Sequence, residues 1–143
     1  MVFSDDVEIL HYVANKLKRP VLSGPSKAEE RMFIFDMFRQ GKIRTLFLSR
    51  IGDEAVDLPN ANVGIELNIQ HGSRKQMLQR LGRIMRQKEA SSSLSYNAMF
   101  YTITTYETLE WKYFFKRYKC LINEGFHYDL RLFEFRPQEI DAI

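Results

Sequence analysis

Short apolar runs alternate along the first half of the chain with longer segments in which apolar residues recur every three or four positions. The short runs occupy residues 1–3, 20–23, 43–48 and 63–67. Their length and their valine, isoleucine and phenylalanine content predict buried strands. The periodic segments at 7–17 and 27–40 predict amphipathic helices between them. This alternation indicates an α/β fold, with a mostly parallel sheet that is covered by helices on both faces.

Residues typical of helix ends flank these segments. The candidate N-terminal caps are Ser4 to Asp6, the pair Ser26 and Glu29, and the pair Thr104 and Glu107. Each of the two pairs has the spacing of a capping box, in which both side chains bond backbone N–H groups of the first turn. Gly41 and Gly125 follow periodic segments, so each is predicted to end a helix.

The second half of the chain is predicted to contain a polar loop at 87–95, a strand at 96–104, a helix to about residue 124 and a closing strand at 130–133. The predicted apolar face of the last helix comprises Trp111, Phe114, Phe115, Tyr118, Leu121 and Ile122. Beside it lie Lys112, Lys116 and Lys119, which we interpret as a solvated stripe rather than a nucleic-acid contact.

Composition narrows the class of protein further. With 143 residues, 45% of them hydrophobic, the chain is large enough for one globular domain with a core. A net charge of +3 permits nucleic acid as a partner without requiring it. Cys120 is the single cysteine, which excludes an internal disulfide. Because no apolar run approaches the roughly 18 residues of a membrane span, we expect a soluble intracellular protein. The abrupt apolar start suggests a piece of a longer one.

The segment 79–86 concentrates candidate binding chemistry. At about 100° per residue, Gln79, Arg83 and Arg86 fall on one helical face. The opposite face carries Met77, Leu78, Leu81, Ile84 and Met85. The segment can therefore bury one side and hold two guanidinium groups outward, which suits an anion such as a triphosphate. A plain basic surface helix is the alternative.

The segment 49–59 lies between the third and fourth predicted strands, where parallel sheets place ligand loops. Asp53 and Glu54 could hold magnesium as a Walker B pair, but they do not directly end the apolar run. No glycine-rich phosphate loop of the Walker A type occurs in the sequence. This chain is therefore not expected to house a nucleotide alone.

The order of these parts resembles the second RecA-like lobe of a superfamily 2 helicase, with residues 49–59 as motif V and 79–86 as motif VI. The finer likeness is to the XPB branch, the DNA translocase subunit of the transcription and repair factor TFIIH. Features that look like this branch include Gly52-Asp53, Asp57-Leu58-Pro59, Gly72-Ser73-Arg74, Gln79 to Arg83, Tyr96-Asn97-Ala98, Lys116-Arg117 and Glu124-Gly125. Ala55 departs from the glycine of many superfamily members, which weakens the inferred DNA contact of motif V.

The resemblance implies roles for individual residues. Arg83 and Arg86 would be arginine fingers that reach the γ-phosphate of ATP bound, with magnesium, to a first lobe absent from this chain. Gln79, Gly52 and Asp57 would lie on the nucleotide side, with Asp57 near the ribose. Ser49 would approach the DNA backbone, and Arg50 and Arg74, expected at the carboxyl edge of the sheet, are further candidates for phosphate contacts.

The implied function is that of the C-terminal half of an ATP-dependent translocase on double-stranded DNA, acting in transcription initiation and nucleotide excision repair. Its expected partners are the first RecA-like lobe, other TFIIH subunits and a nuclease or regulator, and its expected location is the nucleus. Residues 1–143 would form this lobe and lack ATPase activity alone. The alternative is a helicase-like module for protein docking, without motor activity.

Overall fold

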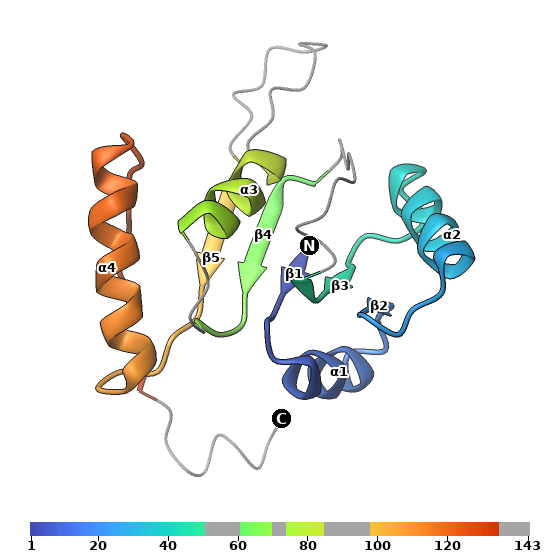
Figure 1. Ribbon diagram of the computed structural model, residues 1–143, viewed down its shortest axis with the longest axis horizontal. Helices are drawn as coiled ribbons and strands as arrows, with labels where there is room; N and C mark the ends of the chain where they lie inside the picture. Colours follow the sequence, from blue (N-terminus) through green and yellow to red (C-terminus); the bar gives the residue numbers. More distant parts are fainter. Residues whose placement is uncertain (51–60, 70–73, 85–97, 135–143) are drawn as a thin grey trace.

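The computed structural model describes residues 1–50, 61–69, 74–84 and 98–134 (Figure 1). Its five strands form one sheet in the order β2-β3-β1-β4-β5, and every pairing is parallel. The strands are β1 (Val2–Phe3), β2 (Val21–Leu22), β3 (Phe47–Leu48), β4 (Val63–Glu66) and β5 (Met99–Thr102). The helices are α1 (Val7–Lys16), α2 (Ala28–Arg39), α3 (Arg74–Ile84) and α4 (Leu109–Asn123). This architecture confirms the predicted α/β fold.

The register places the carboxyl ends of the strands at one edge of the sheet. Phe3 of the central strand β1 lies opposite Leu48 of β3 and Glu66 of β4. Since parallel neighbours in register point their side chains to the same face, Phe3 and Glu66 share one face. The chain then leaves β1 at Ser4 and β3 at Ser49, so polar residues collect at this edge.

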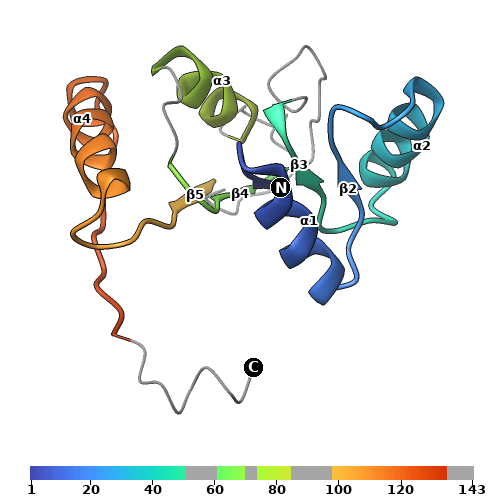
Figure 2. The same cartoon turned by 60° about the horizontal axis from the view of Figure 1, so that its bottom comes forward.

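Helices cover both faces of the sheet, as Figure 2 shows with α1 on the opposite side from α2 and α3. Leu10 and Ala14, one helical turn apart on α1, pack with Val2 and Phe47. A second cluster joins α2 and α3 to the other face, and its nine buried residues include Phe3, Leu22, Phe35, Phe38, Leu48 and Ile84. Val2 and Phe3 therefore lie in hydrophobic clusters on opposite faces of the sheet, because successive side chains of a strand point to opposite faces.

Helix ends follow the sequence signals in three of the five predicted places. Asp6 caps α1, because its Oδ1 accepts the backbone N–H groups of Glu8 and Ile9 at 3.0 Å each. Gly41 and Gly125 have φ values of 72° and 85°, and they follow α2 and α4. This left-handed backbone explains why glycine ends both helices.

Both predicted capping boxes are wrong. The N-cap of α2 is Lys27, and Ser26 Oγ instead accepts the backbone N–H of Ser23 at 3.1 Å, which closes a turn before the helix. Helix α4 begins only at Leu109, because Glu107 adopts a left-handed φ of 59° that a helix cannot contain.

The predicted closing strand at 130–133 is also wrong, since none of these residues is in a strand. Leu130, Leu132 and Phe133 are 56–71% exposed and provide no buried face that would hold a strand in the sheet.

The predicted apolar face of α4 is only partly buried: Phe114 and Leu121 are buried, whereas Phe115 and Ile122 are 41% and 46% exposed. The three lysines of the stripe are exposed, as predicted. No helix in the described ranges is long and apolar enough to cross a membrane.

Candidate phosphate and nucleic acid site

Helix α3 carries the first part of the predicted arginine motif and buries one side. Met77, Leu81 and Ile84 are 4%, 5% and 1% exposed, and they pack against the sheet and α4. Gln79 points outward and is exposed. Apolar residues three and four apart form one face of a helix, so the predicted division of α3 into a buried and an open side is confirmed for these four residues.

The other predicted site residues are described to different extents. Arg74 begins α3 and Arg83 lies in its last turn, although their side chains are outside the described part of the structure. Gly52, Asp57 and Arg86 lie outside the described residues altogether. The functional roles of all five residues stay predictions.

Ser49 and Arg50 leave β3 at the carboxyl edge, but they differ in exposure. Ser49 is 4% exposed, and its backbone N–H donates to the carbonyl of Leu22 at 3.1 Å. The Arg50 side chain is 70% exposed, with its Nε 3.8 Å from Oδ1 of Asp5. At this distance, and with the Arg50 side chain open to water, the ion pair is weak. Of these two residues, Arg50 therefore has the accessible group that an external phosphate could contact.

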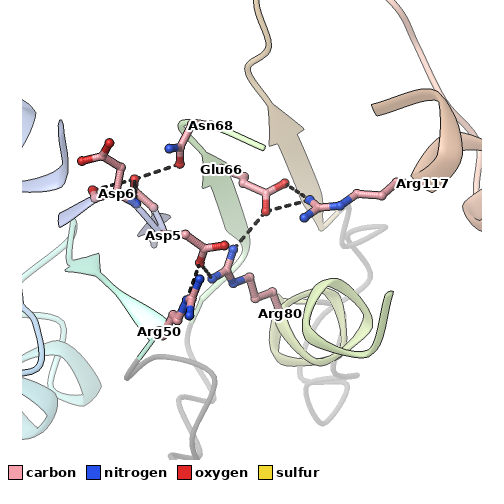
Figure 3. A network of polar contacts seen from close by, with 8 residues as sticks. Asp5, Asp6, Arg50, Glu66, Asn68, Arg80 and Arg117 are labelled. Atoms are coloured by element: carbon pink, nitrogen blue, oxygen red, sulfur yellow. Dashed lines mark hydrogen bonds and ion pairs between the residues drawn. The ribbon is translucent and has the colours of Figure 1, made fainter. Parts of the chain in front are cut away.

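Arg80 is buried, which the sequence interpretation did not assign. Its side chain is 1% exposed, and its guanidinium carbon lies 5.3 Å from the centre of the Phe3 ring. Nη1 donates to Oε1 of Glu66 at 2.9 Å, and Nη2 donates to Oδ1 of Asp5 at 2.7 Å (Figure 3). Because a buried guanidinium requires paired acceptors, these two carboxylates make its burial possible.

Glu66 also connects the sheet to α4. Nη1 of Arg117 lies 3.0 Å from Oε1 and 2.9 Å from Oε2 of this carboxylate (Figure 3). The side chains of Glu66 and Arg117 are 1% and 10% exposed. One strand-end carboxylate thus receives arginines from two different helices.

These contacts decide which cations of α3 can serve an external anion. Arg80 is held between two carboxylates and does not offer its charge to a ligand. The sequence contained a usable signal for this burial, because position 80 follows Met77 by three residues and precedes Ile84 by four. Arg80 therefore belongs to the apolar side of the helix, where a charge needs buried partners.

Neutral polar contacts extend the same edge. Oγ of Ser4 lies 2.9 Å from Oδ1 of Asn68 and donates to the backbone carbonyl of Asp6 at 2.8 Å. Near Glu66 and Arg117, burial raises the pKa of Tyr128, while a hydrogen bond with Thr102 acts in the opposite direction. The edge thus combines buried, satisfied groups with the exposed Arg50.

Comparison with known proteins gives a consistent set of matches. The model of the family described as ERCC3/RAD25/XPB C-terminal helicase matches residues 1–136. The general transcription and DNA repair factor IIH helicase/translocase subunit XPB of Drosophila melanogaster is 42% identical over 129 residues, which cover 90% of this chain and 16% of that protein. The Saccharomyces cerevisiae subunit XPB/SSL2 is 39% identical over 127 residues, which cover 88% and 15%.

Solved structures agree on the fold. The C-terminal domain of the DEAD-box protein Dbp5 superposes with a TM-score of 0.68 at 16% sequence identity, covering 85% of this chain and 69% of that one. At this identity the likeness concerns the fold alone, and it matches the predicted RecA-like lobe. The chain spans about a sixth of the length of the XPB proteins that it matches.

Proposed function

The chain belongs to the ERCC3/RAD25/XPB C-terminal helicase family, and from this premise we propose that residues 1–143 form the second RecA-like lobe of an ATP-driven translocase on double-stranded DNA. ATP and its magnesium would be bound mainly by a first lobe, with this lobe closing over the nucleotide. In this arrangement, the present chain supplies positively charged arginine side chains and holds them near the transferred phosphate. Hydrolysis requires both lobes.

The observation that carries the proposal is the division of α3 into two sides. Its buried side is held by Met77, Leu81 and the neutralised Arg80, which leaves the side with Gln79 open. Arg83 and Arg86 would project from this open side toward the γ-phosphate. Guanidinium groups there stabilise the charge that develops in phosphoryl transfer, an effect worth about 10³ to 10⁵ in rate.

Further nucleotide and DNA contacts are proposed at the carboxyl edge of the sheet. Gly52 and Asp57 would meet the nucleotide, with Asp57 near its ribose. Arg50, which is exposed, and Arg74, at the start of α3, would contact DNA phosphates. Ser49 is buried, so its proposed approach to the DNA backbone requires some local opening. Contacts to phosphates carry no base information, so binding would be independent of sequence.

The relatives are named as subunits of general transcription and DNA repair factor IIH. We therefore propose that the protein carrying this lobe works in the nucleus, in transcription initiation and nucleotide excision repair. Its partners would be other subunits of that factor, or a nuclease or regulator that binds this lobe.

An ATPase assay tests the proposal on a protein that carries both lobes, with and without duplex DNA. We expect hydrolysis that duplex DNA stimulates, and none from the 143-residue chain alone. Robust hydrolysis by the isolated chain would contradict the division of labour between the lobes. A two-lobe protein that binds partners but hydrolyses no ATP would instead favour the docking module.

A further inference from the structure

Glu66 is the point at which α3 and α4 are joined through the sheet. Its Oε1 accepts from Arg80 at 2.9 Å and from Arg117 at 3.0 Å, and its Oε2 accepts from Arg117 at 2.9 Å. Glu66 ends β4, and its side chain is 1% exposed. Water therefore screens these contacts little, and a change in one of them is felt by the others.

The charges of this buried group balance. The carboxylates of Asp5 and Glu66 face the guanidiniums of Arg80 and Arg117, and all four side chains are at most 10% exposed. Arg80 divides its two terminal nitrogens between the two acids, so its position depends on how strongly each acid attracts it. The positive charge of Arg117 partly offsets the negative charge of Glu66 and so weakens the attraction between Glu66 and Arg80. Without Arg117, the two carboxylates would share the single buried guanidinium of Arg80, which would then be drawn more strongly toward Glu66.

Polar and apolar contacts between α4 and its neighbours come from the same side of the helix. Leu121, four residues after Arg117, is 5% exposed and packs with Met77 and Leu81 of α3. The apolar contact involves different atoms from the ion pair, so replacing Arg117 leaves it in place. We therefore expect α4 to stay docked when the ion pair is removed.

We propose that Arg117 is a positioning residue for ATP hydrolysis, which acts through Glu66 and Arg80 to set the placement of α3. This inference rests on the proposed function, in which Arg83 of the same helix reaches the transferred phosphate. In this proposal Arg117 acts through its contact with Glu66 and does not itself bind nucleotide or DNA. Because a displacement of about 1 Å in a catalytic group can lower the rate about 100-fold, a small shift of α3 is enough to affect hydrolysis.

The test measures steady-state ATP hydrolysis by a protein that carries both lobes. Arg117→Met keeps most of the side-chain length and removes the charge, and Lys116→Met makes the same exchange at the neighbouring exposed position. We expect Arg117→Met to lower kcat 10-fold to 100-fold, with KM for ATP and duplex affinity changed by less than about twofold. Lys116→Met should match the unmodified protein, and Arg117→Lys should recover part of kcat.

Further variants separate positioning from folding. Glu66→Gln should lower kcat as well, and the double variant Glu66→Gln with Arg117→Met should lose less than the product of the two single losses, because both act on one interaction. The folded fraction of each variant is measured by circular dichroism at the assay temperature. A kcat that falls only in proportion to the folded fraction would overturn the positioning role.

The remaining outcomes separate this inference from the proposed function. If Arg117→Met hydrolyses ATP as fast as the unmodified protein, Arg117 has no positioning role, while the proposed function stands. If the unmodified two-lobe protein and Lys116→Met both fail to hydrolyse ATP, the proposed function is wrong and this inference fails with it.

Discussion

Oδ1 of Asp5 accepts a hydrogen bond from Nη2 of Arg80 at 2.7 Å, although the two residues are 75 positions apart in the sequence. Asp5 follows the central strand β1, and Arg80 lies in the middle of α3. The bond therefore attaches the arginine motif helix directly to the centre of the sheet. Together with the contact to Glu66, it gives α3 two polar attachments besides its apolar face.

Arg80→Met should strongly destabilise the fold. The change leaves Asp5 and Glu66 buried with less compensating charge, a situation that typically costs about 3–5 kcal/mol. Urea unfolding of the chain measures the loss. The control is Arg39→Met, which breaks an exposed pair with Asp36 and should change the free energy of unfolding by less than about 1 kcal/mol. Equal effects of the two substitutions would contradict a structural role for Arg80.

Arg83→Ala and Arg86→Ala should each abolish most ATP hydrolysis in a two-lobe protein and leave ATP affinity comparatively intact. Their proposed charge acts mainly on the transition state, so the loss is expected in kcat, by about 10³-fold or more. Neither substitution should change the thermal unfolding midpoint appreciably. A variant that loses activity in proportion to lost thermal stability would identify its arginine as structural.

Duplex binding by this lobe alone should be weak, independent of sequence and sensitive to salt. Two or three phosphate contacts correspond to a slope of about −2 to −3 in a plot of log affinity against log salt. Arg50→Ala and Arg74→Ala should each reduce the magnitude of this slope by about 1. Lys116→Ala on α4 is the control and should leave the slope unchanged. The opposite pattern would place the DNA site on α4.

Gly64→Ala should destabilise the sheet where β4 meets β5. A Cβ at position 64 would lie 2.5 Å from Cδ2 of Phe100 and 3.0 Å from Cγ1 of Ile84, so the Phe100 ring has to move. Overpacking of this kind costs about 1–3 kcal/mol. Gly24→Ala adds the same methyl group with nothing within 4 Å, and urea unfolding should show a much smaller change for it. Equal stabilities of the two variants would show that the core accommodates the methyl group.

Alkaline pH should destabilise the fold partly through Tyr128. Burial raises the pKa of Tyr128 above its ordinary value, so the folded state favours the neutral phenol. This contribution to stability is complete below about pH 10 and is lost as the pH rises through the folded-state pKa. Unfolding free energies measured from pH 9 to 11 should fall less steeply for Tyr128→Phe than for the parent chain. The same pH dependence of the free energy of unfolding in both chains would contradict a raised pKa of Tyr128.

Much of this fold could be predicted because its signals are local. The apolar run at 63–67 has a strand's period and became β4, and Asp6 stands directly before a periodic segment that became α1. The failures are local patterns that tertiary structure overrides. Thr104 and Glu107 have the spacing of a capping box, yet the left-handed backbone of Glu107 moves the start of α4 to Leu109.

The division of α3 into an open and a buried side could be predicted from the sequence, but the ion pairs of Arg80 could not. The spacing of Gln79 and Met77 indicated which side of α3 is open and which is buried, and both assignments hold. Pairing of Arg80 with Asp5 and Glu66 depends on which strands become neighbours of β1, and no local pattern contains that information. The partner of Glu66 on α4, Arg117, is equally non-local.

The central place of β1 has a consequence for how the protein is made. Val2 pairs with Phe47 on one side and with Ile65 on the other, so β1 leaves the ribosome long before either neighbouring strand exists. Contacts between such distant positions slow folding and leave apolar strands exposed meanwhile. Phe3 therefore lacks its neighbours Leu48 and Glu66 until β3 and β4 have been synthesised.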